Sequence, residues 1–194
     1  MNKRTILAIM LASALPGCGQ PANMPPPLAG ATMGGAFALT NQDGKAVTDR
    51  DFVGKYRLIY FGYSYCPDVC PVDVQRLMQG FRMLETRDPA RAARLQPIFI
   101  TVDPQRDTPA VLKQFVTAFH PQLIGLTGSQ AQIAEVAKNY AAVYQKADGG
   151  SKDAYLVDHS RTAILYAPDN SPIAIISQDA SPDAIATELA RWIK

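Results

Sequence analysis

Residues 60–71 read Tyr60-Phe61-Gly62-Tyr63-Ser64-Tyr65-Cys66-Pro67-Asp68-Val69-Cys70-Pro71. An apolar run typical of a buried strand ends at Gly62, and an apolar helical pattern begins just after Pro71. The two cysteines therefore lie in a loop between a strand and a helix, where a rigid scaffold commonly presents reactive groups. Such thiols could form a structural bridge, carry out redox chemistry or hold a metal.

Strands and helices alternate along the rest of the chain. Apolar runs and alternating patterns predict strands, and apolar residues three or four positions apart predict helices. The predicted strands cover residues 36–40, 45–48, 57–61, 98–102, 123–126, 142–146, 162–166 and 173–176, and the predicted helices cover residues 72–84, 109–119, 129–140 and a last segment that begins at Ser181. This alternation predicts an α/β fold. We expect a thioredoxin-like three-layer sandwich, with a mixed central sheet flanked by helices and an N-terminal β-hairpin.

The first 35 residues differ in character from this domain. Lys3 and Arg4 precede an uncharged apolar stretch, as in an export signal. The sequence Leu15-Pro16-Gly17-Cys18 resembles a bacterial lipobox, which predicts a lipoprotein-type signal peptide over 1–17 and lipidation of Cys18. The alternative is cleavage by ordinary signal peptidase, which would leave Cys18 removed or free. Residues 18–35 are rich in proline, alanine and glycine and predict a flexible tether. The thioredoxin-like domain is then expected over 36–194, on the periplasmic side and anchored by lipid in the inner membrane.

Composition excludes one large class of partner. The chain has 194 residues, of which 47% are apolar and 19% charged, as expected for a globular domain with a core. Removal of the signal would take away Lys3 and Arg4 and leave 17 basic and 17 acidic residues. There is also no cluster of basic residues, so we expect no nucleic-acid partner.

A purely structural bridge between the cysteines is disfavoured. A domain of this size folds without a disulfide, and closing so short a loop adds little stability. Pro67 and Pro71 each disfavour helical backbone at the preceding cysteine, so we expect Cys66 and Cys70 to lie outside the helix. Pro71 suits the first helical position, which would place Cys70 at a helix N-terminus that favours the thiolate.

A histidine is the expected third member of the site. In thioredoxin-like folds, the loop before the strand predicted at 162–166 faces the thiol loop and usually carries a cis-proline; here that region holds His159. His120, at the end of a helix, is expected to cap it instead. Two thiolates and one imidazole suit copper, Cu(I) or Cu(II), better than zinc, which lacks an obvious fourth ligand. Asp158 is either a residue that orients His159 or a solvated turn residue.

Three motifs in this chain resemble the SCO/SenC family of copper chaperones for cytochrome c oxidase. They are residues 60–71, Thr101-Val102-Asp103-Pro104-Gln105-Arg106-Asp107-Thr108-Pro109, and Tyr155-Leu156-Val157-Asp158-His159-Ser160, and the resemblance covers about residues 36–194. It implies that Cys66, Cys70 and His159 bind one copper ion per chain. It implies two partners, the copper-centre subunit of the oxidase and a periplasmic copper donor. Asp103 and Asp107 either contribute to docking and support of the site or form the turn and cap into the next helix.

The resemblance implies a metallochaperone that delivers copper to the dinuclear copper centre of the oxidase. The main alternative is a thiol–disulfide reductase that keeps the copper-ligand cysteines of the oxidase reduced. In that enzyme Cys66 and Cys70 would be the redox pair and His159 would be dispensable. A non-catalytic lipoprotein interaction module would need neither cysteine.

Overall fold

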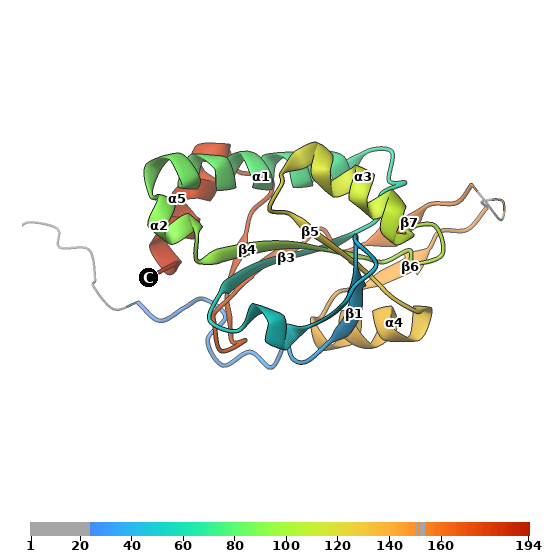
Figure 1. Ribbon diagram of the computed structural model, residues 1–194, viewed down its shortest axis with the longest axis horizontal. Coiled ribbons are helices and arrows are strands. Elements are labelled where there is room, and N and C mark those ends of the chain that lie inside the picture. The colour runs from blue at the N-terminus through green and yellow to red at the C-terminus, as the bar shows by residue number, and fades with distance from the viewer. Residues whose placement is uncertain (1–23, 150, 152–153) are drawn as a thin grey trace, which may run out of the picture.

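The computed structural model describes residues 24–149, 151 and 154–194. Within these residues seven strands form one sheet in the order β2-β1-β5-β4-β3-β8-β9, and β6 and β7 form a separate pair (Figure 1). The strands are β1 (Ala38–Asn41), β2 (Ala46–Thr48), β3 (Tyr56–Gly62), β4 (Leu95–Thr101), β5 (Ile124–Thr127), β6 (Tyr144–Lys146), β7 (Val157–His159), β8 (Ala163–Tyr166) and β9 (Pro172–Ile176). The helices are η1 (Asp49–Phe52, a 3₁₀ turn), α1 (Val69–Arg87), α2 (Pro89–Ala92), α3 (Pro109–Phe119), α4 (Gln130–Asn139) and α5 (Pro182–Trp192). The predicted signal peptide and Cys18 lie outside the described residues.

The sheet is mixed, as predicted. Its centre is parallel, since β3 pairs with β4 and β4 with β5 in the same direction. Parallel neighbours need crossover connections, which α1 and α3 supply. The β8–β9 hairpin adds antiparallel strands beside β3, and the predicted N-terminal hairpin β1–β2 adds them beside β5. The thioredoxin-like layout expected from the sequence is confirmed.

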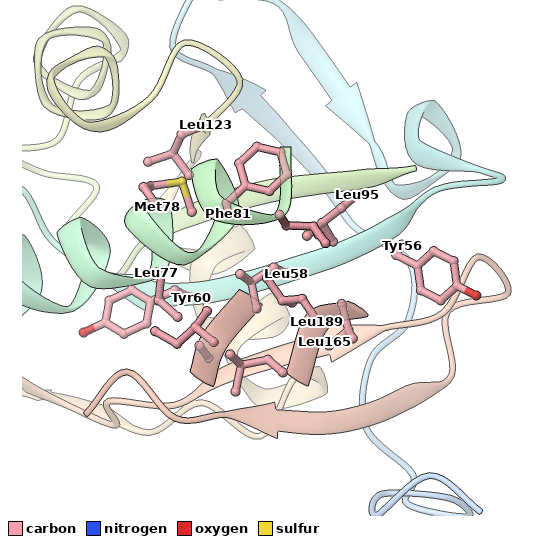
Figure 2. Packing of buried hydrophobic residues seen from close by; sticks show 14 of the residues in the cluster. Tyr56, Leu58, Tyr60, Leu77, Met78, Phe81, Leu95, Leu123, Leu165 and Leu189 are labelled. Atoms are coloured by element: carbon pink, nitrogen blue, oxygen red, sulfur yellow. The ribbon is translucent and has the colours of Figure 1, made fainter. Parts of the chain in front are cut away.

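Helices cover both faces of the sheet, with α1, α3 and α5 on one side and α4 on the other (Figure 1). Successive side chains of a strand point to opposite faces, which explains the unbroken apolar run in β3. Leu58 and Tyr60 face α1 and α5, and Ile59 and Phe61 face α4. Figure 2 shows Leu58 and Tyr60 among the side chains that α1 and α5 bring to this core.

The start of the described chain packs against the domain. The Leu28 N–H donates to the Ile173 carbonyl at 3.0 Å, and the Gly34 N–H donates to the Asn139 carbonyl at 2.8 Å. The side chains of Leu28 and Met33 lie against the α4-side core. Residues 28–35 were predicted as part of the tether, but their apolar contacts and hydrogen bonds attach them to the domain. Residues 18–23 of that tether lie outside the described part.

Two helices begin where their capping residues predict. The hydroxyl of Thr108 accepts a hydrogen bond from the Val111 N–H, and the hydroxyl of Ser181 accepts one from the Ala184 N–H. The start of α1 differs: it begins at Val69, so Cys70 lies in its first turn and the prediction that Cys70 lies outside the helix is wrong. The N–H groups of a first turn have no partner within the helix, so Pro71 is tolerated there.

The strand predicted over 142–146 does not lie at the edge of the main sheet. Residues 144–146 form β6 and pair antiparallel with β7, a strand the sequence did not predict. The three residues of β7 are too few to show an alternating pattern. This pairing matters because β7 ends with His159.

Candidate metal centre

Two thiols and one imidazole meet beyond the end of β3. The sulfurs of Cys66 and Cys70 and a ring nitrogen of His159 all lie within 4.8 Å of one another. The Cys70 Sγ is 3.0 Å from the His159 Nε2. Cys70 is fully buried, Cys66 is 8% exposed and His159 is half-buried. Both cysteines are free thiols, so the structure brings together the three residues the sequence singled out.

Gly62 allows Cys70 to lie close over the end of β3. A Cβ at position 62 would meet the Cys70 Sγ at 3.0 Å and the Tyr60 ring at 2.9 Å. The thiol loop then turns back on itself: the Cys66 N–H donates to the Tyr63 carbonyl at 3.3 Å, and the Cys70 N–H donates to the Cys66 Sγ at 3.4 Å. Backbone hydrogen bonds therefore hold the two sulfurs at the start of α1, and the absence of a side chain at Gly62 leaves room for them.

Asp107 anchors the loop that leads to Cys66. Its buried carboxylate accepts hydrogen bonds from the Ser64 N–H at 3.0 Å, from the Ser64 hydroxyl, and from the Thr101 hydroxyl at 2.6 Å. Burial raises the pKa of Asp107, although the hydrogen bonds from Ser64 and Thr101 oppose that rise. Capping of α3 falls to Thr108, so Asp107 supports the site instead of starting the helix.

Asp103 joins the same segment to the strand of His159. It is 3% exposed, and it accepts hydrogen bonds from the Tyr155 hydroxyl at 2.7 Å and from the Arg106 guanidinium. That guanidinium lies 3.7 Å above the centre of the Tyr155 ring. Neither Asp103 nor Asp107 reaches the surface, so their carboxylates serve internal support in this structure.

His159 is presented by β7 with a defined ring orientation. The Tyr63 hydroxyl accepts a hydrogen bond from the Val157 N–H at 3.2 Å, which ties β7 to the thiol loop. The His159 Nδ1 is 3.1 Å from the Ser160 carbonyl oxygen. A carbonyl only accepts, so Nδ1 carries the proton and the lone pair of Nε2 faces Cys70.

Asp158 does not orient the ring as one prediction held. It is exposed and lies opposite Gln145 in the β6–β7 pair. Neighbouring residues of a strand point to opposite faces, so the carboxylate of Asp158 and the imidazole of His159 diverge. The Ser160 carbonyl takes the orienting position instead, and the reading of Asp158 as a solvated residue fits the structure.

Burial sets the protonation of the two interior ligands. It raises the pKa of the Cys70 thiol and lowers the pKa of His159. Before metal binds at neutral pH, Cys70 is therefore a thiol and His159 a neutral imidazole. The start of α1 was expected to favour the thiolate of Cys70, but at this fully buried sulfur the loss of solvent outweighs the helix dipole.

His120 lies apart from this centre, as predicted. It follows the last residue of α3, its Nδ1 accepts a hydrogen bond from the Gln122 N–H at 3.2 Å, and its Nε2 is 3.0 Å from a Glu85 carboxylate oxygen. Its contacts are those of a buried residue that closes a helix.

The residues that surround the candidate ligands were not predicted from the sequence. The rings of Tyr60 and Tyr63 lie nearly perpendicular to the His159 ring, at centroid distances of 6.2 and 5.9 Å. Asp73, fully buried, binds Arg161 two positions beyond His159. One signal was available: Asp73 lies four residues before Leu77 on the apolar face of α1, and a carboxylate there needs a partner.

The three donors fit copper. Three atoms bound to one ion at 2.0–2.3 Å lie roughly 3.5–4 Å from one another, so a trio whose members all lie within 4.8 Å, with Cys70 and His159 at 3.0 Å, needs only small shifts to share an ion. Thiolates and imidazole are the soft and intermediate donors that copper prefers. Tetrahedral zinc would need a fourth ligand, and among the described residues no other histidine, cysteine or carboxylate belongs to the group.

Known proteins resemble this chain in both sequence and fold. A sequence model of the SCO1/SenC family matches residues 26–194. Protein SenC of Rhodobacter capsulatus is 42% identical over 165 residues, which cover 85% of this chain and 72% of SenC. The mitochondrial SCO2 homolog of Bos taurus is 40% identical over 81% of this chain, which spans only 58% of the bovine protein. The copper-bound structure of Bradyrhizobium japonicum ScoI superposes with a TM-score of 0.75 at 38% identity, covering 82% of this chain and 99% of ScoI. With the Cys-Cys-His group in place on this fold, the chain belongs to the SCO1/SenC family.

Proposed function

We propose that the chain is a metallochaperone that carries one copper ion on Cys66, Cys70 and His159 and delivers it to the dinuclear copper centre of cytochrome c oxidase during assembly. The observation that carries the proposal is the 3.0 Å approach of the His159 Nε2 to the Cys70 Sγ. An imidazole at this position supplies a third metal ligand. Thiol–disulfide exchange, by contrast, does not require an imidazole beside the cysteines. The copper-bound relative from Bradyrhizobium japonicum supports the choice of metal.

Copper is the cargo, and the burial of its ligands suggests the order of release. Incoming thiolates of the recipient reach the half-buried His159 and the slightly exposed Cys66 before the fully buried Cys70. Each new copper–sulfur bond replaces one bond to this chain, and each released cysteine thiolate takes up a proton. The oxidation state of copper does not change, so the step needs no electron donor.

The N-terminal sequence supports a site of action at the membrane. A lipid on Cys18, after removal of the signal peptide, would hold the domain at the periplasmic face of the inner membrane, near the oxidase and a periplasmic copper donor. Leu28 is the first of the described residues that is hydrogen-bonded to the β8–β9 hairpin, and it lies ten positions after Cys18, so the tether reaches at most about 35 Å. No helix in the described part of the chain combines the length and apolarity needed to cross a bilayer.

A reductase acting on the same oxidase subunit is the second candidate. It is favoured by the two free thiols, since the Cys70 N–H contacts the Cys66 Sγ and a disulfide could form after a modest movement. One feature opposes it: no cis peptide bond occurs among the described residues, so the cis-proline usual before β8 is not present there.

The His159→Ala variant separates the two functions. We expect it to reduce a disulfide in the oxidised oxidase subunit at the wild-type rate, but to lose copper transfer to the reduced subunit. Cells that carry this variant should then lack oxidase activity, whereas cells with the control variant His120→Ala should retain it. Normal oxidase activity in cells whose His159→Ala protein no longer holds copper would favour the reductase.

A further inference from the structure

An ion pair with a buried carboxylate connects the helix of Cys70 with the segment of His159. Asp73 lies about one turn beyond Cys70 on α1, and Arg161 lies two residues beyond His159. The Arg161 Nε is 2.9 Å from one carboxylate oxygen of Asp73, and the Arg161 Nη2 is 2.6 Å from the other. This two-point geometry fixes direction as well as distance.

The carboxylate is held from a third side by Tyr60. The Tyr60 hydroxyl donates to Asp73 at 2.8 Å, and the ring of the same tyrosine lies nearly perpendicular to the His159 ring. Asp73 is completely buried, whereas Arg161 extends to the surface, where its Nη2 also lies 3.1 Å from exposed Asp179. The ion pair therefore joins a carboxylate in the interior, close to the candidate ligands, to a guanidinium at the surface of the molecule.

Few other contacts hold His159 against the thiol helix. Its strand β7 has three residues and pairs only with β6, outside the main sheet. The Val157 N–H bonds to Tyr63 before the histidine, and the Ser160 N–H bonds to the Val143 carbonyl after it, at 2.8 Å. The first of these hydrogen bonds connects β7 to the loop before Cys66, and the second connects the residue after β7 to the residue before β6. Apart from the approach of His159 to Cys70 itself, the polar contact of this segment with α1 comes from Arg161.

We propose that the Arg161–Asp73 pair is a positioning clasp that keeps the imidazole of His159 within ligating distance of Cys70. Cys66 and Cys70 come from the thiol loop and the start of α1, where their own backbone hydrogen bonds hold them. Opening the clasp should therefore release the nitrogen ligand while the two sulfurs stay in place. This inference rests on the proposed copper function, but the clasp also has consequences in the metal-free protein.

The variants must avoid a lone buried charge. Removing Arg161 alone would leave the Asp73 carboxylate unpaired in the interior, which destabilises a protein for reasons unrelated to His159. The double variant Asp73→Asn/Arg161→Leu removes both charges and leaves an amide oxygen to accept from Tyr60. Arg161→Lys keeps the charge but loses the two-point geometry. Arg76→Leu is the matched control, because Arg76 also approaches exposed Asp179, at 3.8 Å, whereas among the described residues Asp73 forms its ion pair with Arg161 and not with Arg76.

The first experiment uses full-length reduced protein without metal. Amide hydrogen exchange is followed at Ser160 and, as a reference for global opening, at Ile59 in β3. We expect exchange at Ser160 to accelerate at least tenfold relative to Ile59 in the double variant, less in Arg161→Lys, and not at all in Arg76→Leu. An unchanged ratio in the double variant would overturn the clasp, whether or not the protein binds copper.

The second experiment adds copper. We expect the Cu(II)-loaded double variant to lose nitrogen hyperfine coupling in its electron paramagnetic resonance spectrum but to keep its sulfur-to-copper absorption. Its Cu(I) affinity should fall at least tenfold, and adding His159→Ala should cause little further loss. Retained nitrogen coupling at wild-type affinity would overturn the proposal. Failure of the wild-type chain to bind copper would instead refute the proposed function and leave the exchange result to decide the clasp.

Discussion

The Cys70 Sγ and the His159 Nε2 lie 3.0 Å apart, although 89 positions separate the two residues in the chain. Cys70 comes from the first turn of α1, and His159 from a short strand outside the main sheet. A pair of redox thiols needs only the first of these elements. The short strand that carries His159 is explained by a ligand set in which sulfur and nitrogen bind the same ion.

The two histidines of the chain should differ sharply in their effect on copper binding. We expect His159→Ala to lower the affinity for Cu(I) by at least about 10- to 100-fold, because it removes a ligand and not merely a neighbour of one. His120→Ala should leave that affinity unchanged, since His120 contacts Glu85 and Gln122. A competition titration with a chromophoric Cu(I) chelator measures both. Equal affinities in the two variants would refute the three-ligand site.

Copper binding should release a proton from Cys70. Burial raises the pKa of this thiol, so the metal-free protein keeps it protonated throughout pH 6–9, whereas copper binds the thiolate. The affinity therefore rises with pH, by about a factor of ten per pH unit for this one proton. Burial lowers the pKa of His159, so above its ordinary value of 6.5 the imidazole is already neutral and releases no proton.

Titrations of copper affinity between pH 6 and 9 check this expectation. Cys70→Ser should reduce the slope of log affinity against pH by about one. An affinity independent of pH would show that Cys70 is a thiolate before the metal arrives.

The sequence predicted the sheet and the ligands for a physical reason. Strands such as β3 and β4 are buried on both faces and give unmistakable apolar runs, and the order of elements then places the segment before β8 opposite the thiol loop. That placement identified His159 without knowledge of any contact.

The degree of burial of each ligand and the polar pairs between distant residues could not be predicted from the sequence in the same way. The full burial of Cys70 depends on Gly62, on the Tyr60 ring and on the packing of α1, and no local pattern encodes it. The rule that a residue before proline avoids the helix is a steric preference, and it failed at Cys70, which lies in the first turn of α1. Pro71 itself is tolerated there because the first turn has no internal hydrogen bond for it to break. The bond between Asp73 and Arg161 joins positions 88 apart, so only the assembled fold reveals it.

Adding a methyl group at Gly62 should damage the site. A Cβ there would approach the Cys70 Sγ, the Tyr60 ring and the Phe99 ring to 3.0 Å or less. We expect Gly62→Ala to lower the free energy of unfolding by about 1–3 kcal/mol through overpacking, and to weaken Cu(I) binding roughly tenfold by displacing the sulfur. Urea denaturation and Cu(I) competition measure the two effects.

Gly125→Ala provides the matched control. Its Cβ would meet Val116 at 3.0 Å, away from the metal ligands, so it should cost comparable stability and leave copper affinity unchanged. If both variants bind copper as the wild type does, Gly62 has no special relation to Cys70.

Asp107 should contribute more to stability than an exposed acid in the same region. Asp107→Ala leaves the Ser64 N–H and the Thr101 hydroxyl without their acceptor in the interior, which we expect to lower the free energy of unfolding by roughly 2–4 kcal/mol. Asp68→Ala, an exposed position whose side chain caps nothing, should change it by less than about 0.5 kcal/mol. Urea denaturation at pH 7 compares the two; equal midpoints would show that Asp107 does not anchor the thiol loop.

The central claim is that Cys66, Cys70 and His159 bind one copper ion together. Its most direct test is X-ray absorption spectroscopy of the reduced full-length chain, loaded without oxygen with Cu(I) and separately with Cu(II). The account predicts one copper per chain, with two sulfur ligands at about 2.2–2.3 Å and one imidazole nitrogen at about 2.0 Å, and loss of only the nitrogen in His159→Ala. A spectrum with sulfur ligands alone, identical in the wild type and in His159→Ala, would contradict it.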